Sequence, residues 1–402
     1  MSSFEMEFKR LTRQTHSSSP ETEAPADLMD SPRRSVRVIA VAGGKGGIGK
    51  TMVSASISMA LAEAGRRVVL IDADLGGANV HTVMGVPQPD RTLYDFVVRK
   101  VKTLEELLIP SPFESLQLIC GSPGTIGMAN LEHWEKLKFI RHFHRLLADY
   151  VVVDIGAGMS INEVDLFNAG DIPIVVANPE PTSIQECFNF LKVAIFRRLR
   201  REFANSPGVQ ELLDRSQDPT HVHDQRLLTE IGEEVKRKSI RDGVRFFRLL
   251  NDFSPKLILN RVFDFRETRE GMALQIAAQD MLRLRLEFWG YMNYDPNIAK
   301  AVRNMSPGDI LNSDSENRRR FLQMVRKHLL GEKVQYRALR TRTILPLLDL
   351  HERISPQGRI CSIECPLWSK CELQEGGLPC RMPDEMYEER SRQFSTPPDK
   401  AQ

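Results

Sequence analysis

The sequence has no long hydrophobic run, almost no excess charge and only six cysteines in 402 residues. No apolar stretch approaches the roughly 18 residues that a membrane-spanning helix needs, and one of the longest covers only residues 174–177. Residues 5–10 carry charges where a secretory signal would have its apolar segment, so we expect a cytoplasmic protein. Six cysteines are too few for a disulfide scaffold, which leaves the clustering of four of them at 361–380 to be explained.

The balance of 55 basic and 53 acidic side chains gives a net charge of +2. Such a balance excludes a protein that coats nucleic acid through a uniformly basic surface, although it leaves local patches open. We predict a disordered tail over residues 1–34, because its residues 17–32 hold acids, serines and prolines and no base. The alternative is a partner-docking helix that presents Phe4, Phe8 and Leu11 on one face.

From residue 35 onward, short apolar segments alternate with stretches that have helical periodicity. Continuous apolar strands joined by helices indicate a parallel sheet covered on both faces. We therefore predict a doubly wound α/β domain with a mostly parallel sheet over residues 35–332. The predicted strands cover residues 36–42, 67–73, 116–120, 150–154, 172–177, 256–260 and 286–291.

Two segments fall outside this alternation. Residues 197–254 separate a predicted helix from the next predicted strand, and a structureless loop of that length would be unusual inside a compact domain. We predict a helical insertion there. Residues 333–402 form a predicted C-terminal extension that contains the cysteine cluster.

A glycine-rich segment at residues 44–51 fits the phosphate-binding pattern G-x-x-x-x-G-K-[ST], after a predicted strand and before a predicted helix. Glycines let backbone N–H groups surround phosphate oxygens, and the helix N-terminus adds its positive dipole end. Lys50 would contact the β- and γ-phosphates, and Thr51 would bind Mg²⁺ through its hydroxyl. The predicted nucleotide-binding residues in this segment are Gly44, Lys45, Gly46, Gly47, Ile48, Gly49, Lys50, Thr51 and Met52.

Polar side chains follow further strands at the sheet edge where such folds bind ligands. Asp154 has the position of a Walker B carboxylate, which holds Mg²⁺ through water. Asp72 and Asp74 follow another strand, and we assign to Asp72 an outer-shell role at the magnesium. Asn260 ends a third strand, and its amide has the donor and acceptor that adenine recognition needs, with a turn residue as the alternative.

The string GGKGGIGKT at residues 43–51 resembles the deviant Walker A motif of the MinD/ParA family of P-loop ATPases. The resemblance covers about residues 36–330 and implies a P-loop NTPase fold with ATP and Mg²⁺ as ligands. It also implies that ATP joins two copies into a homodimer, in which Lys45 reaches the phosphates held by the other subunit. Within the family, the strings DADLGGAN and NPEPTSI are most similar to MinD-like, FlhG-type regulators.

The resemblance extends to the two switch segments of the family. The first is similar to residues 72–79, so that Asp74 would orient the attacking water and Gly76 and Asn79 would belong to the moving loop. The second is similar to residues 151–158, in which Gly156 and Gly158 permit movement beside the γ-phosphate. In the family, the asparagine that matches Asn260 reads adenine.

The cysteine cluster has the spacing C-x₃-C-x₅-C-x₈-C. Clustered thiols in a cytosolic protein favour a metal site, with Zn²⁺ preferred to an iron–sulfur cluster and inert reduced thiols as the alternative. The predicted metal-binding residues are Cys361, Cys365, Cys371 and Cys380. Iron–sulfur carriers related to these ATPases use a C-x-x-C pair, which this sequence lacks.

A basic, amphipathic segment lies between Arg318 and Arg342, with nine lysines and arginines and one acid. Its pattern is typical of a helix that packs on a sheet, and an anionic membrane or DNA are the alternative partners.

Together the motifs predict an ATP-dependent dimerising switch that hydrolyses ATP slowly, under stimulation by an unknown protein partner. It would control the positioning, number or assembly of that partner or of a cellular structure. The alternatives are an iron–sulfur carrier and a nucleotide-binding scaffold that does not hydrolyse ATP. We expect it in the cytoplasm, with attachment to the membrane or the nucleoid left open.

Overall fold

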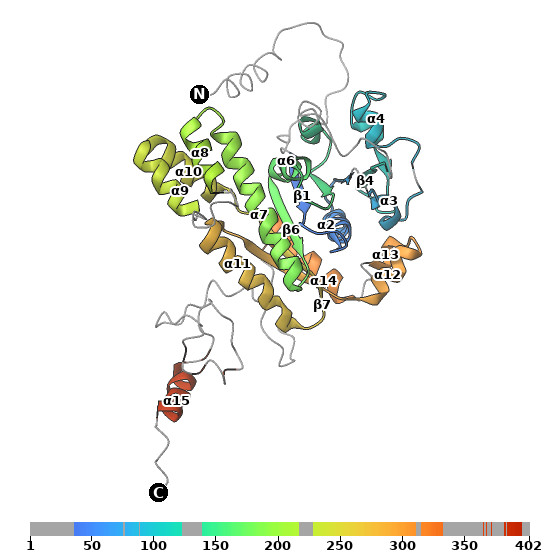
Figure 1. Ribbon diagram of the computed structural model, residues 1–402. Helices are drawn as coiled ribbons and strands as arrows, with labels where there is room; N and C mark the ends of the chain where they lie inside the picture. Colours follow the sequence, from blue (N-terminus) through green and yellow to red (C-terminus); the bar gives the residue numbers. More distant parts are fainter. Residues whose placement is uncertain are drawn as a thin grey trace, which may run out of the picture. The chain divides into compact units, whose positions relative to one another are not determined.

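A computed structural model describes most of the chain from residue 36 onward (Figure 1). All described residues belong to the unit that runs from Ser35 to Gln402. The predicted tail at 1–34 lies outside them, as do two of the four clustered cysteines. The described residues are 36–74, 77–87, 89–122, 139–216, 228–310, 315–332 and 384–395, together with Cys365, Leu367, Cys371 and Met382.

One sheet organises the described part of the chain, with the strand order β3-β4-β2-β5-β1-β6-β7-β8. Every neighbouring pair is parallel except β3 and β4, which are antiparallel. The predicted doubly wound, mostly parallel α/β fold is therefore confirmed. The strands are β1 (Arg37–Ala42), β2 (Val68–Ala73), β3 (Ile109–Pro110), β4 (Leu116–Ile119), β5 (Tyr150–Ile155), β6 (Ile172–Ala177), β7 (Lys256–Val262) and β8 (Glu287–Asn293).

The central strand β1 shows why these apolar segments become buried strands. Side chains alternate between the faces of a strand, so β1 supplies two hydrophobic cores. Ile39 and Val41 join the core that contains helix α2, whereas Val38 and Ala40 join the core that contains α6 and α7. Both faces are covered, which is why these strands lack the polar alternation of an exposed sheet.

Helices cover both faces of the sheet (Figure 1). The connecting helices are α2 (Lys50–Glu63), α3 (Val80–Val83), α4 (Leu93–Val97), α6 (Ile161–Ala169), α7 (Pro181–Glu202), α11 (Arg269–Leu282), α12 (Pro296–Arg303), α13 (Pro307–Ile310) and α14 (Glu316–Met324). Short 3₁₀ turns occur at η1 (Glu105–Leu107) and η3 (Phe265–Thr268), and a π-helical turn, η4 (Val325–Leu329), continues α14. A further helix, α15, spans Asp384–Ser395. None of the described helices combines the length and apolar character that a bilayer crossing requires.

The basic helix α14 packs its apolar face against the body of the domain. Phe321, Met324, Val325 and Leu329 are buried in the same core as α2. Arg319 is exposed, whereas Arg318 and Arg320 are half-buried, which agrees with a helix that packs on the sheet. Residues 333–342 of the predicted basic segment lie outside the described residues.

The described part of the predicted insertion at 197–254 contains the last residues of α7, which runs to Glu202, and three further helices: α8 (Pro207–Arg215), α9 (Leu228–Lys238) and α10 (Ile240–Asp252). They lie together beside the C-terminal end of α7 (Figure 1). Phe203, at the end of α7, packs with buried Phe246 of α10 at a ring-centroid distance of 6.0 Å. The helices therefore share the main core of the domain.

Two glycines let α9 and α10 cross closely. A Cβ on Gly232 would lie 2.6 Å from the Phe247 ring, and one on Gly243 would lie 2.5 Å from the Cα of Lys236. A backbone atom at that distance can move aside only if the helices separate.

We expect Gly243→Ala to lower the free energy of unfolding by roughly 1–3 kcal/mol, because overpacking forces the two helices apart. Gly208→Ala is the matched control, since Gly208 also lies in an insertion helix and has open space around its Cα. That change should be neutral or stabilising, by up to about 1 kcal/mol, because alanine favours helix. Urea unfolding of the two variants measures the difference, and equal effects would contradict the close crossing.

Candidate functional site

The loop between β1 and α2 holds the phosphate-binding pattern. Gly47 and Gly49 both have left-handed backbone conformations, with φ of 75° and 87°. Gly49 is the N-cap of the 14-residue helix α2, and no side chain caps that end of the helix. Its first backbone N–H groups and its positive dipole end are thus available for an anion.

The first half of the loop lies against β6 and α7. A Cβ on Gly43 would lie 2.8 Å from the carbonyl oxygen of Val176, and one on Gly44 would lie 2.3 Å from the carbonyl oxygen of Glu186. Only glycine permits this approach of two backbones. Gly46, in contrast, has room beside Ala157.

Lys50 points into a group of carboxylates. It is buried, with 8% of its surface exposed, and burial lowers its pKa. The negative charges of Asp154, Asp74 and Glu163 oppose that shift. The structure therefore brings Lys50 together with two of the three predicted aspartates. Thr51 and Met52 follow it in the first turn of α2 and are half-buried.

Asp154 lies at the C-terminal end of β5 and is almost fully buried. Its Oδ1 accepts a hydrogen bond of 2.9 Å from the hydroxyl of Ser54, and the hydroxyl of Thr51 also donates to the carboxylate. Burial raises the pKa of Asp154 to about 6, although these hydrogen bonds and Lys50 act in the opposite direction. Ser54 was not predicted as a site residue. It lies one helical turn after Lys50 and therefore on the same face of α2, so its spacing from Lys50 was the signal that pointed to it.

Asp72 lies opposite Asp154 in the register of β2 and β5 and is fully buried. Its Oδ1 accepts from the backbone N–H of Asp74 at 3.1 Å, and its Oδ2 accepts from those of Asn79 and Val80 at 2.9 Å each. Burial, and then the charge of Asp154, raise its pKa to about 7. Asp72 thus fixes the loop that follows β2.

The two predicted switch segments meet at Asp74. Its Oδ1 accepts a hydrogen bond of 2.8 Å from the backbone N–H of Gly77. A Cβ on Gly156 would lie 3.1 Å from the same oxygen, so the loop after β5 passes directly beside this carboxylate. Gly158 has a φ of 125°, which glycine adopts readily. Gly76 lies outside the described residues.

Lys45 contacts the N-terminal turn of α7. Its side chain is exposed, and Nζ donates a hydrogen bond of 3.4 Å to the hydroxyl of Thr182, at the N-terminus of α7. This contact was not predicted, because Thr182 lies 137 residues away, in the first turn of α7.

Asn260 comes from β7 and holds the phosphate loop. Its Nδ2 donates to the carbonyl oxygen of Ile48 at 2.7 Å, and its Oδ1 accepts from the backbone N–H of Arg261 at 2.9 Å. A Cβ on Gly49 would lie only 2.1 Å from this Nδ2. The predicted role of Asn260 was adenine recognition. In the structure its amide instead contacts the phosphate loop, which was not predicted.

The cysteine cluster is only partly described. Cys365 and Cys371 are half-buried, whereas Cys361 and Cys380 lie outside the described residues. Within the described part of the chain, no group of three or more His, Cys, Asp or Glu side chains is arranged to hold a metal ion. The prediction of zinc or iron–sulfur binding gains no support from this structure.

Known proteins resemble the chain over the same region. The antiactivator FleN of Pseudomonas aeruginosa is 38% identical over 160 residues, which cover 39% of this chain and 56% of FleN. The septum site-determining protein MinD of Buchnera aphidicola is 29% identical over 195 residues, which cover 48% of this chain and 72% of that MinD. The match to FleN thus spans little more than half of that relative's length.

Among solved structures, MinD from Pyrococcus horikoshii in complex with Mg-ADP aligns with 74% of this chain and 98% of its own. The sequence identity is 21% and the TM-score is 0.49. A family model described as the CobQ/CobB/MinD/ParA nucleotide binding domain matches residues 39–307, which include every part of the site from the phosphate loop to Asn260. The chain accordingly belongs to the CobQ/CobB/MinD/ParA nucleotide-binding family.

Proposed function

We propose that the protein is an ATPase that dimerises when it binds ATP and acts as a switch on the positioning, number or assembly of a partner. The observation that carries this proposal is the gathering of Lys50, Asp154 and Asp74 beside the uncapped N-terminus of α2. A cation, buried carboxylates and free backbone N–H groups are the parts that phosphoryl transfer needs. The names of the relatives, an antiactivator and a septum site-determining protein, support a regulatory switch.

The residues present fit a magnesium nucleotide. Backbone N–H groups of residues 44–51 and the Lys50 ammonium would hold the phosphates, and Thr51 with Asp154 would hold Mg²⁺. Burial raises the pKa of both Asp72 and Asp154, and the charge of Asp154 raises that of Asp72 further, so a divalent cation beside them would favour their charged forms. Both oxygens of Asp72 already accept backbone N–H groups, so its role would be to position the loop around the ion.

The hydrolytic step would depend on Asp74 and Lys45. Asp74 lies where the two predicted switch loops meet, so it would orient the water that attacks the γ-phosphate. Lys45 is exposed and bonds to Thr182 at the start of α7, so it would be accessible to the phosphates held by a second subunit. A cation placed there would stabilise the negative charge of the transition state.

The test measures oligomeric state and phosphate release with and without ATP and Mg²⁺. Lys45→Ala should abolish the ATP-dependent dimer, and Asp74→Ala should accumulate it while phosphate release falls by roughly 100-fold. Lys102→Ala replaces another exposed lysine and is the matched control, with wild-type behaviour expected. If Asp74→Ala released phosphate at the wild-type rate, the assignment of the attacking water would be wrong. Tight ATP binding without hydrolysis in the wild type would instead favour a scaffold.

A further inference from the structure

The turn between α9 and α10 forms a basic tip around an exposed aliphatic side chain. Lys236, Arg237 and Lys238 end α9, and Ile240 and Arg241 begin α10. All five side chains are exposed, and Ile240 keeps 75% of its surface in solvent. We call these five residues the basic tip. An isoleucine at such a position contributes nothing to the core, so folding alone does not explain it.

The pattern of the basic tip continues along the outer face of α10. Val244 is 52% exposed and lies one turn after Ile240. Arg241, Arg245 and Arg248 follow one another at intervals of four and three residues, so a row of arginines runs beside the pair Ile240 and Val244. Next to them is a hollow of about 400 Å³, which is lined by Lys236, Val244, Phe247, Arg248, Asn251 and Asp252.

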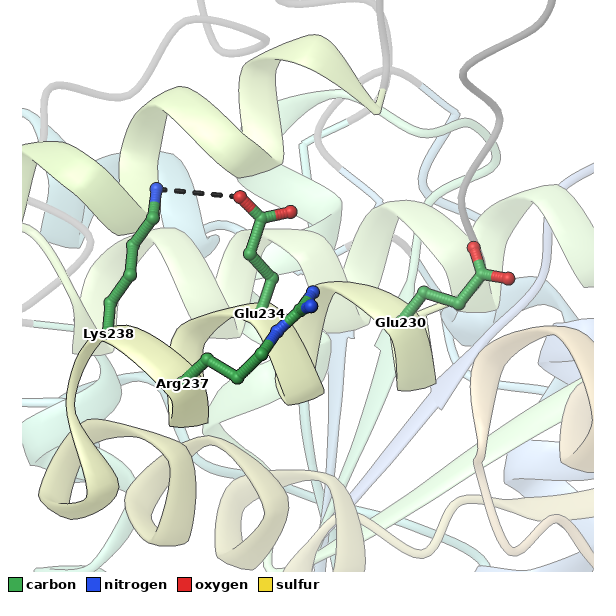
Figure 2. A pocket seen from close by; sticks show the side chains of 4 residues that line it. All are labelled: Glu230, Glu234, Arg237 and Lys238. Atoms are coloured by element: carbon green, nitrogen blue, oxygen red, sulfur yellow. Dashed lines mark ion pairs between the residues drawn. The ribbon is translucent and has the colours of Figure 1, made fainter.

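The cations of the tip are only weakly engaged within the protein. Lys238 pairs with Glu234 at 3.5 Å, and Lys236 pairs with Glu233 at 3.7 Å. Such exposed pairs on one helix contribute little and exchange easily with other anions. Figure 2 shows Glu234 beside Lys238, with which it forms an ion pair, and Glu230 farther from the turn. Residues 235–241, between Glu234 and Asp242, carry four bases and no acid, so the positive charge is concentrated at the turn itself.

The helices below the tip hold it in one position. Their close crossing at Gly232 and Gly243 leaves little room for relative movement. Arg245 forms an ion pair with Glu202 of α7 and lies over the Phe203 ring at 5.3 Å. The tip is thus a rigid projection, whereas the apolar face of α14 is already buried and cannot serve the same purpose.

We propose that the basic tip binds the surface of an anionic lipid bilayer. Ile240 and Val244 would enter the boundary between headgroups and acyl chains, and the surrounding lysines and arginines would contact the anionic headgroups. Aliphatic side chains at the centre of the cations favour lipid over nucleic acid, which is bound through phosphate contacts and aromatic stacking. The aromatic side chain nearby, Phe247, is half-buried and packs on Phe246 at 5.9 Å.

This inference goes beyond the proposed ATPase and does not depend on it. The two sites lie at opposite ends of α7, a 22-residue helix roughly 33 Å long at 1.5 Å per residue. Thr182, which accepts the hydrogen bond of Lys45, lies at its first turn, and Glu202, which pairs with Arg245, is its last residue. Lipid binding at one end can therefore be measured separately from hydrolysis at the other.

The experiment uses the full chain and sedimentation with vesicles of phosphatidylglycerol and phosphatidylcholine, compared with vesicles of phosphatidylcholine alone. The wild type should bind the anionic vesicles and be released by salt. A triple variant, Lys236→Ser with Arg237→Ser and Lys238→Ser, should bind them on the order of 100-fold more weakly. Each lysine or arginine near the membrane surface strengthens binding several-fold, and the variant lacks three of them. Ile240→Ser should weaken binding about tenfold, through the lost apolar contact.

The matched control changes Arg145 and Leu147 to serine, because Leu147 is another exposed aliphatic side chain, at 79%, beside a base. That variant should bind like the wild type, and all variants should keep wild-type ATP hydrolysis. The proposal is overturned if the wild type does not distinguish the two vesicles or if the triple variant binds like the wild type. Binding to duplex DNA that is lost in the triple variant but kept in Ile240→Ser would also overturn it, in favour of a nucleic-acid surface.

Discussion

Replacing Gly49 with alanine is expected to destabilise the nucleotide-free protein by roughly 3 kcal/mol. A non-glycine residue in the left-handed region costs about 1–2 kcal/mol. The new methyl group would also lie 2.1 Å from the Nδ2 of Asn260, so the amide must move away and lose its hydrogen bond to Ile48. A broken hydrogen bond of a buried group adds about 1–3 kcal/mol.

Gly47→Ala is the matched control, because Gly47 has a similar φ of 75° but no atom within 4 Å of the added Cβ. It should lose only the backbone contribution, about 1–2 kcal/mol. Urea unfolding without nucleotide separates the two variants. Gly49→Ala should also bind ATP at least tenfold more weakly, since the contact that fixes the loop is lost. Equal destabilisation by the two alanines would show that Asn260 does not hold the loop.

Replacing Asp154 with asparagine is expected to stabilise the nucleotide-free protein at pH 8 while removing most of its ATPase activity. In the folded protein the pKa of Asp154 is raised to about 6, from an ordinary value of 3.8. The folded state therefore binds this proton more tightly than the unfolded chain does. The stability that the protonated group provides is complete below about pH 4 and is lost as the pH rises through about 6.

Asparagine keeps the shape of the side chain but does not ionise, so the variant avoids this pH-dependent loss of stability. Its free energy of unfolding should exceed that of the wild type by on the order of 2 kcal/mol at pH 8 and by about zero at pH 4. The repulsion that helps raise the pKa of Asp72 disappears as well. Hydrolysis should fall by roughly 100-fold or more, because the carboxylate proposed to hold Mg²⁺ is gone. Thermal unfolding across this pH range, and phosphate release at pH 8, measure the two effects.

The control for this prediction is a second buried aspartate with the opposite role. Asp165 accepts two hydrogen bonds of 2.9 Å from Arg197, so its charge is compensated. Asp165→Asn should destabilise the protein at pH 8 by a few kcal/mol, about 3, because it leaves Arg197 without a full partner. If Asp154→Asn also destabilised the protein at pH 8, the carboxylate pair would not be a source of strain in the nucleotide-free state.

The fold could be predicted because its strands are recognisable as short, purely apolar segments that end in polar or glycine residues. β5 is an example, since three valines lead directly to Asp154. The phosphate loop was equally predictable, because its chemistry requires a local string of residues. Boundaries were less certain: β7 extends to Val262, two residues beyond the predicted end at 260.

Contacts between distant loops could not be predicted. Asn260 and Ile48 are 212 residues apart, and nothing in either segment indicates that the amide donates to that carbonyl oxygen. The same holds for Lys45 on Thr182, which depends on how α7 begins beside the loop. A single sequence also does not show that Gly232 and Gly243 mark a crossing of two helices, because glycine within a helix has several explanations.

The position of β1 between β5 and β6 also affects when the protein can first bind ATP during its own synthesis. β1 precedes the phosphate loop, but its two neighbours leave the ribosome more than 100 residues later, at Tyr150–Ile155 and Ile172–Ala177. At 5–20 residues per second this delay is on the order of ten seconds. During that interval the first strand has no partner on either side, and its apolar residues are open to chaperones. A nascent chain arrested before β6 should therefore fail to retain ATP, although the entire glycine-rich loop has already been translated.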